Sequence, residues 1–426
     1  MSAAAPVIGY AGMTHLGINS AAAASERGFK VVCFDPDAKR IAALARGDAI
    51  VREPGLPELL ARNAGRLVYK REVSALAACD VVYVSPDVPT DDSGASELEA
   101  LRGLIATVEG ALKREAALVV LSQVPPGFTR GLALEESRRF YQVETLIFGR
   151  AVERALHPER FILGCADPAR PLPPALAAFL GSFGCPILPM RYESAELCKI
   201  AINFFLVASL SAANSLAELC ERIGADWAEI MPALRLDRRI GEHAYVAPGL
   251  GLAGGNLERD LATFLRLGAE RGVDTGVVEA WQANSRHRRF WALERLHESV
   301  LSRLDDPLIG VLGLAYKENT HSTKNSPALA LISALAPFRL RAFDPMVKVE
   351  AAWHPALLEA RDPLDACKGV DALVIMTPWP LFKALEPEAI ARAMAGQVVI
   401  DPFGVLDGKA ALAAGLDHRR LGAPRS

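Results

Sequence analysis

The chain has 426 residues and a mass of 45.6 kDa, enough for two or three domains with well-buried cores. It is 51% hydrophobic with a formal net charge of -3, so its charge gives no reason to expect nucleic acid or an anionic membrane as a partner. The seven cysteines are scattered, odd in number and lack a CxxC pair, which favours a reducing cytoplasm over disulfides or a zinc site. No charged and then apolar leader precedes Val7, so we expect no export signal.

The N-terminal third alternates strand-like and helix-like stretches. Residues 7–11 (VIGYA) read as a short apolar strand, residues 18–27 as a helix, and residues 30–35 (KVVCFD) as a second strand that ends in an aspartate. The turn GMTHLG at 12–17 joins the first strand to the helix. This order predicts a βαβ unit with a glycine turn at the start of its helix.

The glycine turn predicts a dinucleotide site. Such a turn presents helix N-terminal amides to a pyrophosphate, and an acidic residue at the end of the second strand accepts hydrogen bonds from ribose hydroxyls, which favours NAD over NADP. Gly12, Gly17 and Asp35 fill these places, and Asp35 follows Gly12 by 23 positions. Thr14 stands where the second glycine is expected, so a side chain lies where the backbone should approach phosphate.

Further strand-like runs continue this pattern. They lie at 66–70, 80–85, 117–122 and 144–148, with a helical stretch at 97–114. Together they favour a doubly wound parallel sheet, in which ligands lie at the carboxyl ends of the strands. We therefore add Val88 and Gln123 to the predicted cofactor site and regard Glu144 as a candidate site residue, although a surface carboxylate is the simpler interpretation.

Residues 193–223 contain no glycine or proline and predict one long helix. From Ile200 to Ala213 the helix is apolar on nearly every face, so it must be covered by flanking domains or by a second copy of the chain. This run of fourteen residues is shorter than the roughly 20 that a bilayer requires. Glu196, Lys199 and Asn203 share one helical face, and their simplest interpretation is an ion pair plus a hydrogen-bonded amide.

The remainder of the chain adds a glycine loop and a second α/β unit. Four glycines fall within residues 249–255, which lead into a helix carrying Asp260; such a loop lets main-chain amides approach a ligand. From 307 onward, strand-like and helical stretches alternate again. The expected fold class is α/β, with two Rossmann-like doubly wound domains, the second smaller, joined by the long central helix.

At this point the order of the pieces resembles the UDP-glucose/GDP-mannose 6-dehydrogenase family, over essentially the whole chain. The matching stretches are EPGLPELL (53–60), VPPG (124–127), HPERFILG (157–164), AELCKIAINF (195–204), RIG (239–241), PGLGLAGG (248–255), and GLAYKENT with SP (313–320, 326–327). The resemblance implies an NAD-binding domain at 1–190, a central helical and dimerisation region with the sugar-site loop at 191–303, and a nucleotide-sugar-binding domain at 304–426.

The resemblance also implies a reaction and its residues. In the family a sugar C6 hydroxyl is oxidised to an aldehyde, trapped by a cysteine, oxidised again to a thioester and hydrolysed to a uronate. Lys199 would stabilise the developing alkoxide, Asn203 would hydrogen-bond the oxygen, Asp260 would orient water and Glu144 would serve as base in the hydrolysis. The substrate, a UDP-sugar by family expectation, would contact Gly251, Gly254, Gly255, Arg239 and Lys317. A cytoplasmic homodimer through the central helix and a role in polysaccharide biosynthesis are implied by analogy.

The sequence departs from the family at the nucleophile. Aligning PGLGLAGGNLERD without gaps puts Asn256 at the position of the catalytic cysteine. An amide nitrogen cannot replace a thiolate, and Cys198, beside Lys199, points about 100° away on the helix and reads as a core cysteine. Residues 86–89, His321, Ser322, Lys324 and residues 401–404 also differ from the family pattern.

Three functions remain open from the sequence. The chain could perform one hydride transfer on a nucleotide sugar, or continue through an aldehyde hydrate without covalent catalysis. It could use NAD transiently, as in epimerisation or dehydration. It could also be a catalytically silent binding or regulatory protein, for which Thr14 and Asn256 together are the motivation.

Overall fold

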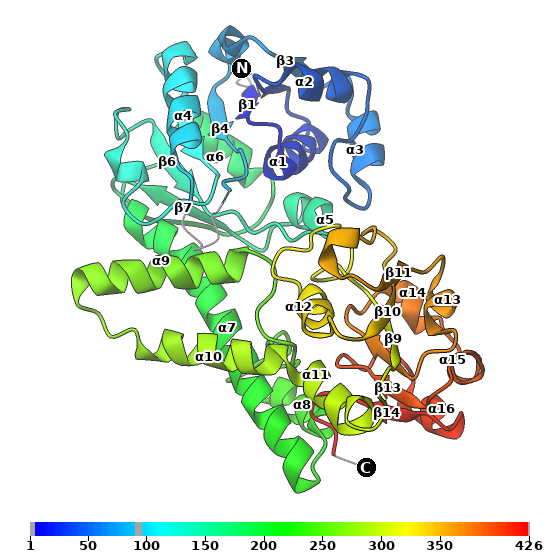
Figure 1. Ribbon diagram of the computed structural model, residues 1–426. Coiled ribbons are helices and arrows are strands. Elements are labelled where there is room, and N and C mark those ends of the chain that lie inside the picture. The colour runs from blue at the N-terminus through cyan, green and yellow to red at the C-terminus, as the bar shows by residue number, and fades with distance from the viewer. Residues whose placement is uncertain (1–4, 90–95, 425–426) are drawn as a thin grey trace. The chain divides into compact units, whose positions relative to one another are not determined.

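The computed structural model describes residues 5–89 and 96–424. The chain divides into two units, residues 1–202 and 203–426. The division falls inside one unbroken helix, α7 (Tyr192–Ile223), which confirms the predicted long helix and appears in green in Figure 1. The finer division at 190 and 303 stays a prediction.

The first unit is built on one sheet. Among its described residues eight strands run in the order β3-β2-β1-β4-β5-β6-β7-β8, and every neighbouring pair is parallel except β6 and β7. The strands are β1 (Ile8–Ala11), β2 (Val31–Phe34), β3 (Leu67–Lys70), β4 (Val81–Val84), β5 (Ala117–Val120), β6 (Arg139–Gln142), β7 (Phe161–Cys165) and β8 (Ile187–Arg191).

Helices cover both faces of this sheet. They are α1 (His15–Glu26), α2 (Ala38–Ala45), α3 (Leu56–Arg62), α4 (Glu99–Ala111), α5 (Ala151–Leu156) and α6 (Pro174–Gly181), with short 3-10 turns η1 (Val73–Ala78) and η2 (Thr129–Gly131). One core packs the sheet against α1, α3 and α6, and the other packs it against α4, η1 and the start of α7. Because both faces are covered, β1, β2, β4 and β5 are buried at every position, which explains their unbroken apolar sequences.

Two sequence predictions for this unit were wrong. The run at 144–148 is not a strand, because the Glu144 carboxylate accepts the Leu146 amide and turns the chain; Ile147 and Phe148 are 42% and 41% exposed rather than buried. The strand that pairs with β5 is instead β6, Arg139–Gln142, whose sequence RFYQ is not a continuous apolar run. Helix α1 begins at His15, three residues earlier than predicted, so Gly17 lies inside it.

The second unit contains the predicted smaller Rossmann-like sheet. Within the described part of the unit six strands are parallel throughout, in the order β11-β10-β9-β12-β13-β14. They are β9 (Leu308–Leu312), β10 (Arg339–Phe343), β11 (Leu357–Glu359), β12 (Ala372–Ile375), β13 (Val398–Ile400) and β14 (Asp417–Arg419). This topology, with the order reversing between β9 and β12, is the doubly wound arrangement that the sequence predicts.

Helices of the second unit fall into two groups. Those that precede the sheet in the chain are α8 (Trp227–Leu236), α9 (Asn256–Arg271), α10 (Gly276–Arg289) and α11 (Trp291–Leu296), followed by a π-helical stretch, His297–Leu301. Those within the α/β part are α12 (Pro327–Ala334), α13 (Pro363–Cys367), α14 (Pro380–Lys383), α15 (Pro387–Ala393) and α16 (Gly408–Ala413), with the 3-10 turn η4 (Ala351–Trp353). Figure 1 shows α9 and α10 as an antiparallel pair of helices.

Helix α7 exposes an apolar stripe. Its exposed large side chains are Leu197, Phe205, Leu216, Leu219 and Ile223, which lie within about 100° of one another around a helix of 3.6 residues per turn. Phe205 is 77% exposed. Among the described residues, these side chains of α7 are not covered as the sequence predicts.

The length argument against a membrane span was too strict. An 18-residue window of α7 has a mean hydropathy of 1.7 with 39% of it buried, so by length and composition the helix could cross a bilayer. Core helices of soluble proteins pass the same test. Asn203 and Asn214 of α7 are buried and bonded to other protein groups, which identifies those faces as packed against protein.

Candidate functional site

The glycine turn of the first unit has the geometry that a dinucleotide requires. Gly12 has a φ of +97°, and a Cβ there would lie 2.7 Å from the Pro86 nitrogen. A Cβ at Gly17 would overlap the Gly12 carbonyl oxygen, so this glycine permits close packing of α1 on the turn. Only glycine fits at either position. These two residues therefore fit the roles predicted for them.

Asp35 ties the same turn to the second strand. The side chain is 2% exposed, and one carboxylate oxygen accepts the Met13 amide at 2.7 Å and Arg40 at 2.8 Å. The other oxygen accepts the Asp37 amide at 2.9 Å. The carboxylate thus lies beside the turn, as a ribose-binding residue should, while it already performs a structural task.

The second unit repeats this device. Gly313 follows β9 with a φ of +94°, and Asp344 follows β10. One Asp344 oxygen accepts the amides of Leu314 at 2.7 Å and Ala315 at 3.0 Å. Because the same contact occurs in both units, locking the first turn is a general function of this aspartate in the fold, separate from any ribose contact.

Thr14 is engaged with the end of β4. Its hydroxyl donates to the Ser85 carbonyl at 3.3 Å and accepts the Asp87 amide at 2.9 Å. In return, the Asp87 carboxylate accepts the His15 amide, in the first turn of α1, at 3.1 Å. The carboxylate therefore lies on a helix N-terminal amide of the kind that binds pyrophosphate, and this contact, like the Thr14 side chain, conflicts with a bound dinucleotide.

The His15 side chain was not singled out by the sequence. Its Nε2 lies 2.7 Å from Glu53 Oε1, and its ring packs against Phe148 with centroids 4.1 Å apart and the ring planes tilted by 32°. The same Glu53 carboxylate accepts the amides of Gly149 at 2.9 Å and Ala151 at 3.2 Å. The first residue of EPGLPELL thereby connects the glycine turn to the segment that follows Glu144.

Val88 and Gln123 follow β4 and β5, as predicted. Val88 is partly buried and packs on the core that contains α4. The two strand ends are joined by Ser122, whose hydroxyl donates to the Pro86 carbonyl at 2.6 Å. Val88 and Gln123 thus lie at the carboxyl edge of the sheet where a cofactor is expected.

Lys199 and Glu144 form an ion pair in the first unit. Lys199 Nζ lies 3.4 Å from Glu144 Oε2, and the side chains are only 12% and 18% exposed. The neighbouring Glu196 is fully buried and accepts the amides of Gly127 at 2.6 Å and Thr129 at 2.8 Å, in and just after the VPPG segment. The pKa of Glu196 is raised, because the effect of burial exceeds the lowering effect of these hydrogen bonds. Lys199 thus pairs with Glu144, which lies outside the helix-face triplet, while Glu196 of the triplet binds backbone amides instead.

Asn203 and Asp260 meet in the second unit. The Asn203 amide nitrogen donates to Asp260, and the two residues are 8% and 1% exposed. Asp260 also accepts from Arg259 Nε at 3.5 Å. A buried carboxylate beside a primary amide can orient a water or a substrate hydroxyl. Within α7, Asn203 follows Lys199 by one helical turn.

Side chains of α7 and α10 bind the backbone of the glycine loop. Asn214 accepts the Gly249 amide at 2.8 Å, and Ser285 Oγ accepts the Leu252 amide at 2.7 Å. Gly251 has a φ of +78°, and a Cβ there would overlap the Ser285 carbonyl. The loop is therefore fixed in place by polar side chains that the sequence analysis did not identify; a polar residue on an otherwise apolar helix, Asn214, was the available signal.

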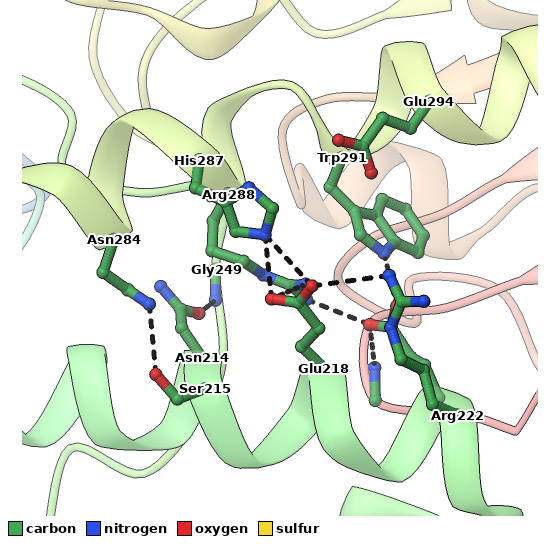
Figure 2. A network of polar contacts seen from close by, with 12 residues as sticks. Asn214, Ser215, Glu218, Arg222, Gly249, Asn284, His287, Arg288, Trp291 and Glu294 are labelled. Carbon is green, nitrogen blue, oxygen red and sulfur yellow. Dashed lines mark hydrogen bonds and ion pairs between the residues drawn. The ribbon is translucent and has the colours of Figure 1, made fainter.

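Figure 2 shows the polar network beneath this loop. Besides the Asn214 to Gly249 bond, Asn284 donates to Ser215 at 3.1 Å and His287 lies 2.9 Å from a Glu218 oxygen. The Arg288 side chain, 2% exposed, lies 3.4 Å from the Glu218 carboxylate. The network joins α7 to α10, and so it fixes the base on which the loop rests.

The far end of the loop contacts the KENTHSTKNSP segment. The Gly254 amide donates to the Lys324 carbonyl at 3.1 Å, and the Asn325 side chain donates to the Gly254 carbonyl at 2.9 Å. A Cβ at Gly254 would lie 3.0 Å from the Tyr316 ring, and one at Gly255 would lie 3.3 Å from the Lys324 side chain. The predicted substrate loop is thus lined by a lysine and an aromatic ring.

Asn256 is the first residue of α9 and is exposed. Two residues later, Glu258 accepts from Arg289 at 3.3 Å and from Asn325. The pKa of Glu258 is raised, because the effect of burial exceeds the lowering effect of Arg289 and Lys324. The helix start after Gly255 therefore carries an amide, with a carboxylate and cations close behind it.

Of the two remaining predicted substrate residues, Arg239 lies apart from these contacts and Lys317 lies beside them. Arg239 is exposed in the turn after α8 and pairs with Asp237 at 2.7 Å. Lys317 lies with its Nζ 5.8 Å from the centre of the Tyr316 ring, next to the loop contact of Gly254. Cys198 packs at the edge of the first unit's hydrophobic core, as expected of a structural cysteine.

Comparisons with known proteins assign the parts of the chain. Residues 7–173 match the NAD binding domain of the UDP-glucose/GDP-mannose dehydrogenase family, residues 193–286 its central domain, and residues 310–408 its UDP binding domain. With the two Rossmann-like sheets, these matches define the class of NAD-dependent nucleotide-sugar dehydrogenases, whose members are soluble. Together they span most of the chain, which belongs to the UDP-glucose/GDP-mannose dehydrogenase family.

Individual relatives agree with this assignment. The chain is 29% identical to a UDP-glucose 6-dehydrogenase of Pseudomonas aeruginosa, over 97% of each protein, and 28% identical to UDP-glucose 6-dehydrogenase TuaD of Bacillus subtilis, over 97% of this chain and 92% of that one. Its fold is similar to a UDP-glucose dehydrogenase structure from Pyrobaculum islandicum, with a TM-score of 0.85, 27% identity, and coverage of 100% of this chain and 98% of that chain.

Proposed function

We propose that this protein oxidises a hydroxyl group of a UDP-sugar with NAD, and that it transfers one hydride per turnover without forming a thioester. The UDP binding domain at 310–408 supports the nucleotide, and the NAD binding domain at 7–173 supports the cofactor. The glycine turn and Asp35 fit NAD, apart from the position of Asp87. When bound, NAD supplies the hydride acceptor.

The observation that carries the proposal is the survival of two buried polar pairs, Lys199 with Glu144 and Asn203 with Asp260. We assign to Lys199 the stabilisation of the developing alkoxide, because an ammonium favours negative charge in a partly buried site. Asn203 hydrogen-bonds the same oxygen. The hydroxyl proton passes to a carboxylate base, Glu144, and the carbon that loses its hydride becomes a carbonyl.

The second oxidation is where we expect this protein to differ from its relatives. Asn256 occupies the aligned nucleophile position, and its amide cannot form a covalent adduct with an aldehyde as a thiolate does. We therefore assign an aldehyde or ketone as the product. Asp260 could orient water for hydration of an aldehyde, which would be the only route onward.

We assign substrate binding to the loop around α9 and the segment facing it. Lys317 and the amides near Gly251, Gly254 and Gly255 suit sugar hydroxyls and phosphate oxygens. Arg239, which is exposed and pairs only with its neighbour Asp237 among the contacts described, is assigned to the same substrate from outside this loop. The reaction is placed in the cytoplasm, where nucleotide sugars and reduced thiols coexist.

The test is the number of NADH formed per sugar consumed, followed at 340 nm with a panel of UDP-sugars and with the product mass recorded. One NADH and a carbonyl product are expected. Two NADH and a uronate would contradict the single-step proposal. A rearranged sugar without NADH would instead indicate transient use of the cofactor, and binding of both ligands without reaction would indicate a silent protein, which the contact between Asp87 and the turn favours among the alternatives.

A further inference from the structure

We propose that the Asp87 carboxylate acts as a built-in competitor for the pyrophosphate of NAD, which must displace it from the glycine turn in order to bind. The inference rests on the proposed function, because it concerns the cofactor site used there. It identifies Asp87 as a residue that sets cofactor affinity.

The contact is a two-way clasp between the turn and the end of β4. The Asp87 carboxylate accepts the His15 amide at 3.1 Å, while the Asp87 amide donates to Thr14 Oγ1 at 2.9 Å. The Thr14 hydroxyl in turn donates to the Ser85 carbonyl at 3.3 Å. Two of the residues that depart from the family pattern, Thr14 and Asp87, are therefore bonded to each other, which explains why Thr14 is accommodated where glycine is expected.

The amide that Asp87 occupies is one that the cofactor needs. His15 is the first residue of α1, a helix of 12 residues with no acidic residue in its own first turn. The first amides of a helix have no partner within the helix, and with the helix dipole they attract an anion. In a βαβ dinucleotide site that anion is the pyrophosphate. A carboxylate satisfies the same amide and leaves a negative charge facing an incoming dianion.

The clasp can open. Asp87 is exposed, unlike the buried Asp35 on the other side of the turn, so its side chain has solvent to turn into once the His15 amide is released. Displacement then costs one charge-assisted hydrogen bond and leaves residual repulsion. We expect the charge to weaken NAD binding by about tenfold, the size of effect that two like charges about 5 Å apart produce at a protein surface.

The experiment is a calorimetric titration of the full-length protein with NAD. Asp87→Asn removes the charge but keeps an oxygen that can accept the His15 amide, and Asp87→Ala removes both. The matched control is Asp167→Asn, an exposed aspartate paired with Arg170 on the loop after β7, in the same unit but three strands away from β4 in the sheet. We expect Kd for NAD to fall by about tenfold in both Asp87 variants and to stay unchanged in the control.

Equal Kd values for wild type and both Asp87 variants would overturn the inference. So would the failure of all variants to bind NAD, because another barrier would then be limiting. A fall in Kd shared by Asp167→Asn would show a general charge effect and would overturn it too. Tighter NAD binding without NADH from any sugar would uphold the competitor while refuting the proposed function, so the two failures are distinguishable.

Discussion

Lys199 is neutralised by a single carboxylate, Glu144, at 3.4 Å, and both side chains are largely enclosed. An ion pair in such a position fixes the direction of the ammonium, and one carboxylate contact does not use all three of its N–H donors. It is therefore available to a substrate oxygen that develops negative charge. A purely structural pair would make the same contact, so the distinction rests on kinetics.

Replacement of Lys199 by methionine tests its role. The change keeps most of the unbranched side chain and removes the charged Nζ, and we expect kcat/KM for the UDP-sugar to fall by about 10²- to 10³-fold, as for the loss of one preorganised group that stabilises an oxyanion. The Kd for NAD should be unchanged. Lys113→Met, which removes a cation paired with Asp80 at the surface, is the control. A Lys199 variant that keeps its kcat/KM would rule out the assignment.

Asn256→Cys tests the missing nucleophile. Asn256 is exposed at the start of α9, where a helix N-terminus lowers the pKa of a thiol and favours the thiolate. If the thiol is the only absent group, the variant should form two NADH per sugar and a uronate. Asn256→Ser, a similar size without a thiolate, should remain at one. An unchanged ratio of one NADH in the cysteine variant would show that other groups of the second oxidation are also absent.

At the scale of the element, helix α7 supports the loop that follows β5 through Glu196. Glu196→Gln replaces one of two accepting oxygens with a donor that faces a backbone amide, so we expect a loss of about 1–3 kcal/mol in the free energy of unfolding. Glu193→Gln, three residues earlier, removes a surface pair with Arg130 and should cost about 0–1 kcal/mol. Urea unfolding measures both, and equal losses would contradict the structural role of Glu196.

The glycine loop offers a comparison between two glycines with similar backbone angles. Gly251 (φ +78°) is crowded by the Ser285 carbonyl, whereas Gly272 (φ +68°), at the end of α9, has open space around it. Gly272→Ala should cost only the conformational strain of a positive φ, about 1 kcal/mol. Gly251→Ala adds a steric clash with backbone and should cost at least about 2 kcal/mol more, by the mechanism of overpacking. Thermal unfolding of both variants measures the difference, and equal melting temperatures would refute it.

Elements with strong periodicity could be predicted from the sequence, and those set by tertiary contacts could not. The apolar strands β1, β2, β4 and β5 and the uninterrupted helix α7 were predicted because pattern and burial agree. The segment 144–148 has strand-forming residues but is turned by its own Glu144 side chain. The clasp of Thr14 with Asp87 joins residues 73 positions apart, and no local pattern reports such a contact.

The candidate site residues could be selected from the sequence, but the residues that hold the site in place could not. Glu144, Lys199, Asn203 and Asp260 were singled out from the sequence pattern and received their roles from the family resemblance, and the structure pairs Lys199 with Glu144 and Asn203 with Asp260. Ser285, which holds the glycine loop, sits on a helix whose sequence looks like an ordinary solvated face. Its role depends on where the loop packs, which the sequence of α10 does not specify.

The largest feature still without a described partner is the exposed apolar stripe of α7. We propose a homodimer through this helix, since a contiguous apolar face on a soluble protein marks an interaction site. Phe205→Asp should convert the dimer to a monomer, because Phe205 is 77% exposed in the single chain and a charge there would be buried on association. Leu412→Asp on α16, 74% exposed, should leave the dimer intact.

Size-exclusion chromatography with light scattering measures the mass of each variant. A wild-type mass of about one chain, or a dimer that survives Phe205→Asp, would contradict the proposal. Loss of the dimer in Leu412→Asp as well would mean that any added surface charge disrupts it, and α7 would not be identified as the interface.

Both nucleotide-type turns in this protein are closed by their own aspartate before any ligand arrives. Asp35 holds the Met13 amide and Asp344 holds the Leu314 amide, each at 2.7 Å. A turn that is rigid in the free protein has little conformational entropy left to lose. Binding of a nucleotide to it therefore carries only a small entropic cost for ordering the backbone. The turns of the two Rossmann-like units are thus preorganised. Amide hydrogen exchange at Met13 and Leu314 should be slow even in the ligand-free protein.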